Sequence, residues 1–329
     1  MDINHTFADI TENLIENIHY SNPWFTPEFV RYSFASIADS LEQDNLKKWV
    51  AAYPELNSKP SQILKVGVIM SGNIPMVGFH DFISVLISGH KFIGRLSSKD
   101  DKLLPAIAKI LLQINNSFRQ NIEFTDNYMK GTDAVIATGS DNSSRYFDYY
   151  FGKNPHIIRK NRNSAAILTG NETSRQLITM ADDIFMYFGL GCRNVSKLFL
   201  PEGYDIPALL QYFEHYSYLG NHNKYANNYE YQRALYLVNQ VPHYDTGFLL
   251  LKEDTGFSSP VGCLYYEFYN DTSLLINHLK KEKDKIQCIA TKSTGFYKRV
   301  KLGSTQKPML WEYADNVDTI KFLLNLSEK

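Results

Sequence analysis

The sequence is poor in the patterns that mark metal-binding and disulfide-rich proteins. It holds three cysteines in 329 residues, at the widely spaced positions Cys192, Cys263 and Cys288, and no CxxC pair. The nine histidines are scattered, with no HxxxH or HExxH spacing. Zinc sites and disulfide frameworks depend on such clusters, so we expect neither a metal site nor a disulfide scaffold.

Charge of one sign and long apolar runs are missing as well. Thirty-four basic and 35 acidic residues give a net charge of −1, which leaves no electrostatic footprint for nucleic acid. No run of 18 apolar residues occurs, so we expect no membrane span. The first 20 residues carry acids and polar groups throughout, unlike a signal peptide. These features predict a soluble, cytoplasmic, globular protein of one large or two linked domains.

The rest of the sequence alternates between strand-like and helix-like patterns. Residues 1–59 show an amphipathic helical pattern interrupted by prolines, and an apolar run at 63–70 follows. Further apolar runs at 91–98 and 134–137 are separated from it by segments with helical spacing. This alternation predicts a parallel, doubly wound α/β sheet. It restarts after Pro155, so we place a domain boundary near residues 155–163.

Two strand-to-helix turns could bind a phosphate group, although the sequence has no GxGxxG fingerprint. They are "SGNIP" at 71–75 and "ATGS" at 137–140. The free amides at a helix N-terminus favour anions, so either turn could hold part of a nucleotide. Equally, Gly72 and Gly139 could serve only to permit tight turns.

Cys192 has an unusual setting in "MYFGLGCRNVSKLFLP", residues 186–201. Gly189 and Gly191 precede it and Arg193 follows, in a connection between a helix-like and a strand-like segment. Functional groups concentrate in such connections, and a thiolate near a cation is a good nucleophile at neutral pH. Arg193 is a candidate for stabilising a nearby anion. The alternative is a buried structural cysteine, which is how we interpret Cys263 and Cys288 in their apolar strand patterns.

Several segments in one order resemble the aldehyde dehydrogenase superfamily, and most closely its LuxC-type acyl-CoA reductase branch. They are "SGNIPMVGFHDFISVLISGHKF", "ATGSDNSSRYFDYYFG", "RKNRNSAAILTGNET", "FGLGCRNVSKLFLP" and "NKYANNYEYQ", and the tail "WEYADNVDTIKFL" is also similar to the family's end. The resemblance implies an aldehyde dehydrogenase-like fold of two doubly wound α/β domains with the active site in the cleft between them. It further implies a cofactor-binding domain at 1–160 with an N-terminal helical segment, a catalytic cysteine domain at 161–300, and a tail at 301–329 that packs back on the core.

The same resemblance assigns roles to individual residues. Cys192 corresponds to the catalytic nucleophile, and Asn73 corresponds to an asparagine of the oxyanion hole. The residues implied in cofactor binding lie at strand ends, beside the phosphates or the adenosine ribose: Arg95, Ser97, Thr138, Gly139 and Ser140. Arg95 also suits the 2′-phosphate that distinguishes NADPH from NADH.

Two departures from the family pattern bear on the chemistry. Arg159 stands at about the place where aldehyde-oxidising members carry a glutamate base, and "FSSPVG" has no clear counterpart of the glutamate that holds the nicotinamide ribose. The first departure argues against oxidation of an aldehyde by water. The resemblance then implies NADPH-dependent reduction of an acyl-CoA, or another acyl thioester, to the aldehyde through an acyl-cysteine. The alternatives are a cysteine acyltransferase without hydride transfer and a non-catalytic scaffold. Expected partners are a small-molecule acyl thioester, an acyl-activating or acyl-transfer protein, and further copies of the chain in a homo-oligomer.

Overall fold

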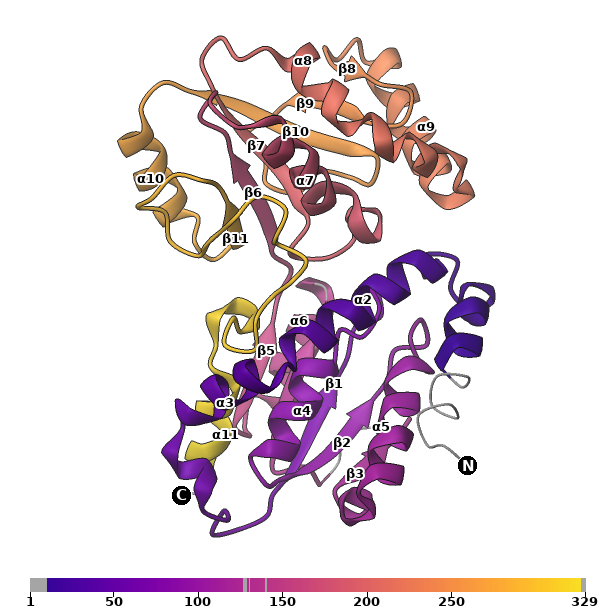
Figure 1. Cartoon of the computed structure of the whole chain (residues 1–329), viewed down its shortest axis with the longest axis vertical. Coiled ribbons are helices and arrows are strands. Elements are labelled where there is room, and N and C mark those ends of the chain that lie inside the picture. The colour runs from indigo at the N-terminus through magenta and orange to yellow at the C-terminus, as the bar shows by residue number, and fades with distance from the viewer. Residues whose placement is uncertain (1–10, 127–128, 130, 140, 327–329) are drawn as a thin grey trace. The chain divides into compact units, whose positions relative to one another are not determined.

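The chain divides into two compact units in the computed structural model, which describes residues 11–126, 129, 131–139 and 141–326 (Figure 1). Unit 1 comprises residues 1–161 and 309–329, and unit 2 comprises residues 162–308. The tail expected at 301–329 is therefore shared. Its first eight residues belong to unit 2, and the segment that belongs to unit 1 begins at Met309.

Unit 1 is built on a five-stranded parallel sheet in the order β3-β2-β1-β4-β5. Its strands are β1 (Lys65–Ile69), β2 (Lys91–Arg95), β3 (Ile122–Phe124), β4 (Ala134–Thr138) and β5 (His156–Arg159). The central strands are buried in their middle residues, because helices cover a parallel sheet on both faces. The chain winds outward from β1 to β3 and then returns to add β4 and β5 on the other side. This is the doubly wound order that the alternation predicts.

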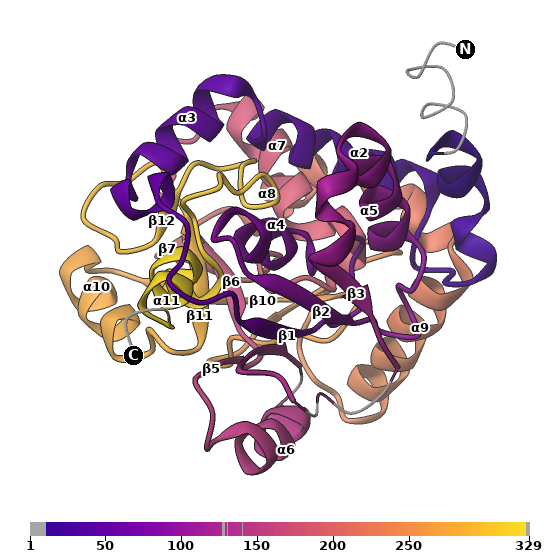
Figure 2. The ribbon, with the colours of Figure 1, turned by 90° about the horizontal axis from the view of Figure 1, so that it is seen from below.

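Helices cover both faces of this sheet. Figure 2 shows α4 and α5 on one side of β1 and β2, and α6 on the other. One core contains Val66, Val68 and Met70, and a second core contains Ile69 and Val135, as the two-residue period of a strand requires. The helices of unit 1 are α2 (Pro27–Ser40), α3 (Gln43–Ala51), α4 (Phe79–Ile87), α5 (Leu103–Ile114), α6 (Asp141–Phe151) and α11 (Thr319–Asn325).

Unit 2 is built on a seven-stranded sheet in the order β12-β11-β6-β7-β10-β9-β8, parallel except for β8. Its strands are β6 (Asn163–Ile167), β7 (Val195–Pro201), β8 (Tyr244–Asp245), β9 (Leu250–Glu253), β10 (Cys263–Tyr269), β11 (Ile286–Ala290) and β12 (Arg299–Val300). Its helices are α7 (Ser174–Phe185), α8 (Ile206–Leu210), α9 (Asn223–Val238) and α10 (Thr272–Lys281). In the described part of the chain, no helix combines the length and apolarity needed to cross a membrane.

The strand order determines which face of the sheet each of the crossover helices α7 and α10 covers. The chain moves from β6 to β7 in one direction along the sheet, and from β10 to β11 in the other. Because parallel crossovers are right-handed, helices of opposite direction cover opposite faces. The sheet face covered by α10 forms a core with it, in which Ala165 and Ile167 of β6 pack with Leu275 and Leu279.

Helix α7 begins with a capping box formed by Thr173 and Gln176.

Arg159, at the end of β5, forms a buried ion pair with α4 and a hydrogen bond with the C-terminal helix α11. The Arg159 guanidinium, at the end of β5, donates through Nη2 to Asp81 Oδ1 at 2.8 Å and to Thr319 Oγ1 at 3.1 Å. Asp81 belongs to α4 and Thr319 is the first residue of α11. Arg159 is 6% exposed and Asp81 is 3% exposed, so each charge depends on the other for its stabilisation.

We predict that Arg159→Ala lowers the free energy of unfolding of unit 1 by about 3–5 kcal/mol, because it leaves the Asp81 carboxylate buried without a cation. The three tryptophans, Trp24, Trp49 and Trp311, all belong to unit 1, so urea unfolding followed by their fluorescence measures this unit. The double variant Arg159→Met/Asp81→Leu should recover most of the loss. A single-variant loss below about 1 kcal/mol would show that the pair does not stabilise the unit.

Candidate functional site

Cys192 lies in a tight turn three residues before β7. The backbone N–H of Asn194 donates to the Gly191 carbonyl at 3.0 Å, so Cys192 and Arg193 occupy the centre of the turn. The Gly191 N–H in turn donates to the Asn194 side-chain oxygen at 2.8 Å. This closed turn leaves the Cys192 side chain exposed. A thiol in this position is accessible to a substrate from solvent.

The other two cysteines are buried in strands. Cys263 begins β10 and Cys288 is central in β11, and burial raises the pKa of each thiol to about 11. The Ser164 hydroxyl lies 3.1 Å from the Cys288 sulfur and donates to the Cys192 carbonyl oxygen at 3.0 Å. Cys288 therefore packs behind the turn that carries Cys192, in a setting that disfavours a thiolate.

Strained backbone precedes the Cys192 turn. Tyr187, Phe188 and Gly189 have φ values of 54°, 57° and 75°, so consecutive residues adopt the left-handed conformation. The strain costs on the order of 1–3 kcal/mol for each of the two aromatic residues, and persists only where surrounding structure enforces it. Here the two side chains are buried, since Tyr187 is 5% exposed and Phe188 is 2% exposed, and their packing helps to hold the backbone in this conformation. Such strain concentrates at functional sites.

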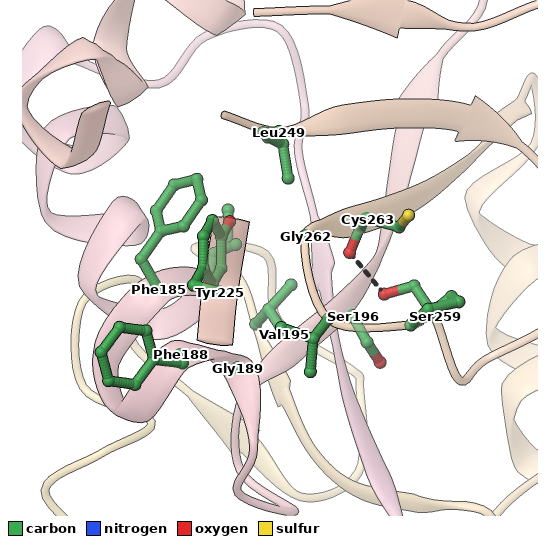
Figure 3. Close-up of a pocket in the computed structure, with 13 residues that line it drawn as sticks. Phe185, Phe188, Gly189, Val195, Ser196, Tyr225, Leu249, Ser259, Gly262 and Cys263 are labelled. Atoms are coloured by element: carbon green, nitrogen blue, oxygen red, sulfur yellow. Dashed lines mark hydrogen bonds between the residues drawn. The ribbon is translucent and has the colours of Figure 1, made fainter. Parts of the chain in front are cut away.

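A small apolar pocket packs against this strained run (Figure 3). Phe185, Phe188 and Tyr225 line one side, and the Ser259 hydroxyl donates to the Cys263 carbonyl at 2.8 Å on the other. The cavity volume is about 20 Å³, which is room for roughly one water molecule. In this structure the aromatic cluster therefore supports the backbone and is too full to hold an acyl chain.

A buried carboxylate fixes a second segment beside the turn. Asp183, on α7, accepts hydrogen bonds from the Gly303 N–H at 2.6 Å, the Thr305 N–H at 2.8 Å and the Thr305 hydroxyl at 2.8 Å. Burial raises the pKa of Asp183 to about 7, against the opposing effect of these hydrogen bonds. The Arg193 guanidinium contacts the Thr305 carbonyl at 3.5 Å. Arg193, expected to stabilise an anion, thus also belongs to this backbone network.

The remaining candidate residues lie at one edge of the unit 1 sheet. Asn73 follows β1, and its side-chain oxygen accepts a hydrogen bond from the Ser71 hydroxyl. Gly72 packs closely against Ser97, since a Cβ on Gly72 would lie 2.6 Å from the Ser97 hydroxyl oxygen. The turn after β1 and the segment after β2 are therefore in contact.

The other residues expected to bind the cofactor lie at or near the carboxyl ends of neighbouring strands. Arg95 ends β2 and is half-buried, Thr138 ends β4, and Gly139 leads into the N-terminal end of α6. Ser140 lies outside the described residues. Because β1 and β4 are the neighbours at which the chain reverses its direction of winding, their carboxyl ends form the edge where doubly wound sheets bind ligands. Arg95, Thr138 and Gly139 belong to unit 1, whereas Cys192 belongs to unit 2.

Reasoning from the sequence missed Asn194 and Asp183. Both are buried polar residues, 2% and 0% exposed. A signal for Asp183 was present, because it interrupts the apolar face of a helix in "ITMADDIF". No comparable signal marks Asn194, which directly follows Cys192-Arg193. In the described part of the chain, no group of three or more histidine, cysteine, aspartate or glutamate residues could hold a metal ion.

Comparisons with known proteins agree with this architecture. The family model described as acyl-CoA reductase (LuxC) matches residues 35–207. The structure of aldehyde dehydrogenase 21 from Physcomitrella patens, in complex with the reaction product succinate, is similar with a TM-score of 0.69 and 12% identity, covering 98% of this chain and 83% of that chain. An aldehyde dehydrogenase from Bacillus cereus in complex with NAD+ gives a TM-score of 0.61 and 11% identity, covering 89% and 71%. No curated protein sequence matches significantly. The aldehyde dehydrogenase-like fold is thereby confirmed.

We predict that iodoacetamide labels native protein at Cys192 before Cys263 or Cys288. Cys192 is exposed, whereas the raised pKa of about 11 lowers the thiolate fraction of each buried cysteine at neutral pH by about a hundredfold relative to an ordinary thiol. Peptide mass spectrometry after limited labelling at pH 7 measures the three sites separately. Labelling in urea is the control, since all three should then react. Equal labelling under native conditions would contradict the observed burial.

Proposed function

The chain belongs to the LuxC family of acyl-CoA reductases, and from this premise we propose that Cys192 is its nucleophile and NADPH its hydride donor. The enzyme is an oxidoreductase of the aldehyde-forming type. In the proposed reaction Cys192 takes the acyl group from an acyl-CoA, and reduction of the resulting thioester releases the aldehyde. Unit 1 is then the cofactor-binding unit, and unit 2 carries the acyl group.

The observation that carries the proposal is the contrast among the three cysteines. Cys192 is exposed in a turn held by side-chain hydrogen bonds, while Cys263 and Cys288 are buried in strands. A nucleophile must reach its substrate and must be held in a defined geometry, and both conditions are met at Cys192.

The proposed acylation needs no activated water. The Cys192 sulfur attacks the acyl carbonyl, a new thioester bond forms, and coenzyme A leaves as a thiolate. Negative charge develops on the carbonyl oxygen, and the side-chain amide of Asn73 and the backbone N–H of Cys192 are the proposed donors to it. Removing one such donor typically costs about 3–4 kcal/mol of transition-state stabilisation.

Hydride transfer then completes the cycle. NADPH, when bound, supplies the hydride to the acyl carbon. The carbon–sulfur bond breaks, the aldehyde leaves, and Cys192 is restored. Arg159 supports reduction over oxidation of an aldehyde by water, because its guanidinium pairs with Asp81 at about the place where oxidising relatives carry a glutamate base. Hydrolysis of the acyl-cysteine would waste the substrate, so a site without that base suits a reductase.

The edge of unit 1 fits a dinucleotide. The N-terminal end of α6 suits a phosphate, and Arg95 presents a cation at the end of β2. Gly139 has no room for a side chain, because a Cβ there would lie 2.9 Å from Phe147 and from Ser143. The turn therefore packs directly against α6, which follows it. One structural relative, the aldehyde dehydrogenase from Bacillus cereus, was determined as an NAD+ complex.

We predict that Cys192→Ala abolishes aldehyde formation and leaves NADPH affinity within about twofold, because the nucleophile and the proposed cofactor edge belong to different units. NADPH oxidation with acyl-CoAs from acetyl to palmitoyl measures the first effect, and fluorescence titration measures the second. Cys263→Ala is the matched control and should keep its turnover. Acylation of Cys192 without NADPH oxidation would instead indicate an acyltransferase, and neither reaction would indicate a scaffold.

A second variant tests the choice of cofactor. We expect the native protein to prefer NADPH, and Arg95→Ala to reduce the ratio of kcat/KM for NADPH to that for NADH by roughly ten- to hundredfold. The physical reason is the loss of a charge-assisted contact with the 2′-phosphate. Lys109→Ala, which removes a cation from α5 without altering a strand end, is the control. A native preference for NADH, or an unchanged ratio in Arg95→Ala, would remove Arg95 from the phosphate site.

A further inference from the structure

Asn194 closes the turn that carries Cys192 with two hydrogen bonds to Gly191. Its backbone N–H donates to the Gly191 carbonyl at 3.0 Å, and its side-chain oxygen accepts from the Gly191 N–H at 2.8 Å. The residue is 2% exposed, so these bonds form away from competing water. One residue thus bonds both peptide groups of Gly191, the residue directly before Cys192.

The same side chain anchors the turn to the preceding helix. The Asn194 amide nitrogen lies 2.7 Å from the Met186 carbonyl oxygen and 3.3 Å from those of Asp183 and Ile184. The last turn of an α-helix leaves carbonyls without helical donors, and α7 ends at Phe185. The left-handed residues that follow cannot continue the helical ladder, so a side-chain donor takes its place.

The chemistry of asparagine suits this position specifically. The site needs an acceptor for one N–H and a donor for several carbonyls within a single short side chain. An aspartate supplies the acceptor without the donor, and an alanine supplies neither. Removing the amide would leave buried carbonyls unsatisfied at the end of α7 and would release the strained run beside Cys192.

We propose that Asn194 is the positioning residue of the active site, which holds the Cys192 sulfur in the geometry for attack on the acyl thioester. This inference rests on the proposed role of Cys192 as the nucleophile. Asn194 acts through the backbone of Gly191 and the carbonyl of Met186, and touches no reacting atom. Displacement of a reacting group by about 1 Å can cost about a hundredfold in rate.

The test separates positioning from simple exposure of the thiol. Acylation is measured as the pre-steady-state release of coenzyme A, per thiol, with the best substrate among acyl-CoAs from acetyl to palmitoyl. Alkylation of Cys192 by iodoacetamide, a small reagent that needs no bound pose, is measured in parallel. In Asn194→Ala we expect acylation per thiol to fall by roughly ten- to hundredfold and alkylation to stay within about threefold. Asn194→Asp, which keeps the acceptor, should also lose acylation.

Thr291→Val is the matched control. Thr291 is 0% exposed, donates to the Ile167 carbonyl at 2.8 Å and accepts from the Ser293 N–H at 3.2 Å. It directly follows β11, whereas Cys192 precedes β7, and these strands run in the same direction on either side of β6. The control therefore removes buried hydrogen bonds at the opposite edge of the same sheet. We expect its acylation rate per thiol to be unchanged.

The outcomes are distinct. Acylation at the wild-type rate in Asn194→Ala overturns the proposal, and so does an equal fall in acylation and alkylation, which would indicate a purely structural role. If neither Asn194→Ala nor Asn194→Asp gives folded protein, the role of Asn194 is structural and the proposal is overturned. If the wild-type protein releases no coenzyme A and acquires no acyl group at Cys192, the proposed function itself fails, and this inference fails with it.

Discussion

Parallel strands place all their carboxyl ends at one edge of a sheet, and this constraint organises unit 1. The turns after β1, β2 and β4 must meet, although the chain between them forms helices on both faces. Polar residues at these ends therefore gather without any local signal that links them. The contact of Gly72 with Ser97 is the direct consequence. A nucleotide site at this edge needs no special device beyond the winding of the chain.

Unit 2 positions Cys192 in a different way. Cys192 precedes β7, so it lies at the amino edge of the parallel strands of its sheet, whereas the residues discussed in unit 1 lie at a carboxyl edge. The backbone reaches that position through left-handed residues that a regular connection would avoid. Buried polar side chains compensate for this irregularity. Asn194 binds the backbone on one side of the turn, Ser164 binds it on another, and Asp183 holds the neighbouring segment at Gly303–Thr305.

Buried polar groups of this kind constrain a structure more sharply than apolar packing does. An apolar side chain can shift and keep most of its stabilisation, whereas a buried amide must satisfy specific donors and acceptors. Arg159 shows the same principle in unit 1. It pairs with Asp81, and its hydrogen bond to Thr319 attaches the C-terminal helix to the sheet.

Hydrophobic periodicity in the sequence determined the parallel α/β architecture, and ordered motifs indicated the family and the distinct setting of Cys192. Periodicity reports which face of an element is buried, and a motif reports local chemistry. Neither reports which distant backbone group a buried polar side chain will satisfy. The bonds of Asp183 to residues 120 and more positions away, the anchoring of Asn194 to the end of α7, and the inclusion of residues 301–308 in unit 2 were therefore decided by tertiary structure. These contacts exist only once the sheet has aligned its strands, because close packing then leaves a buried polar group few partners within reach.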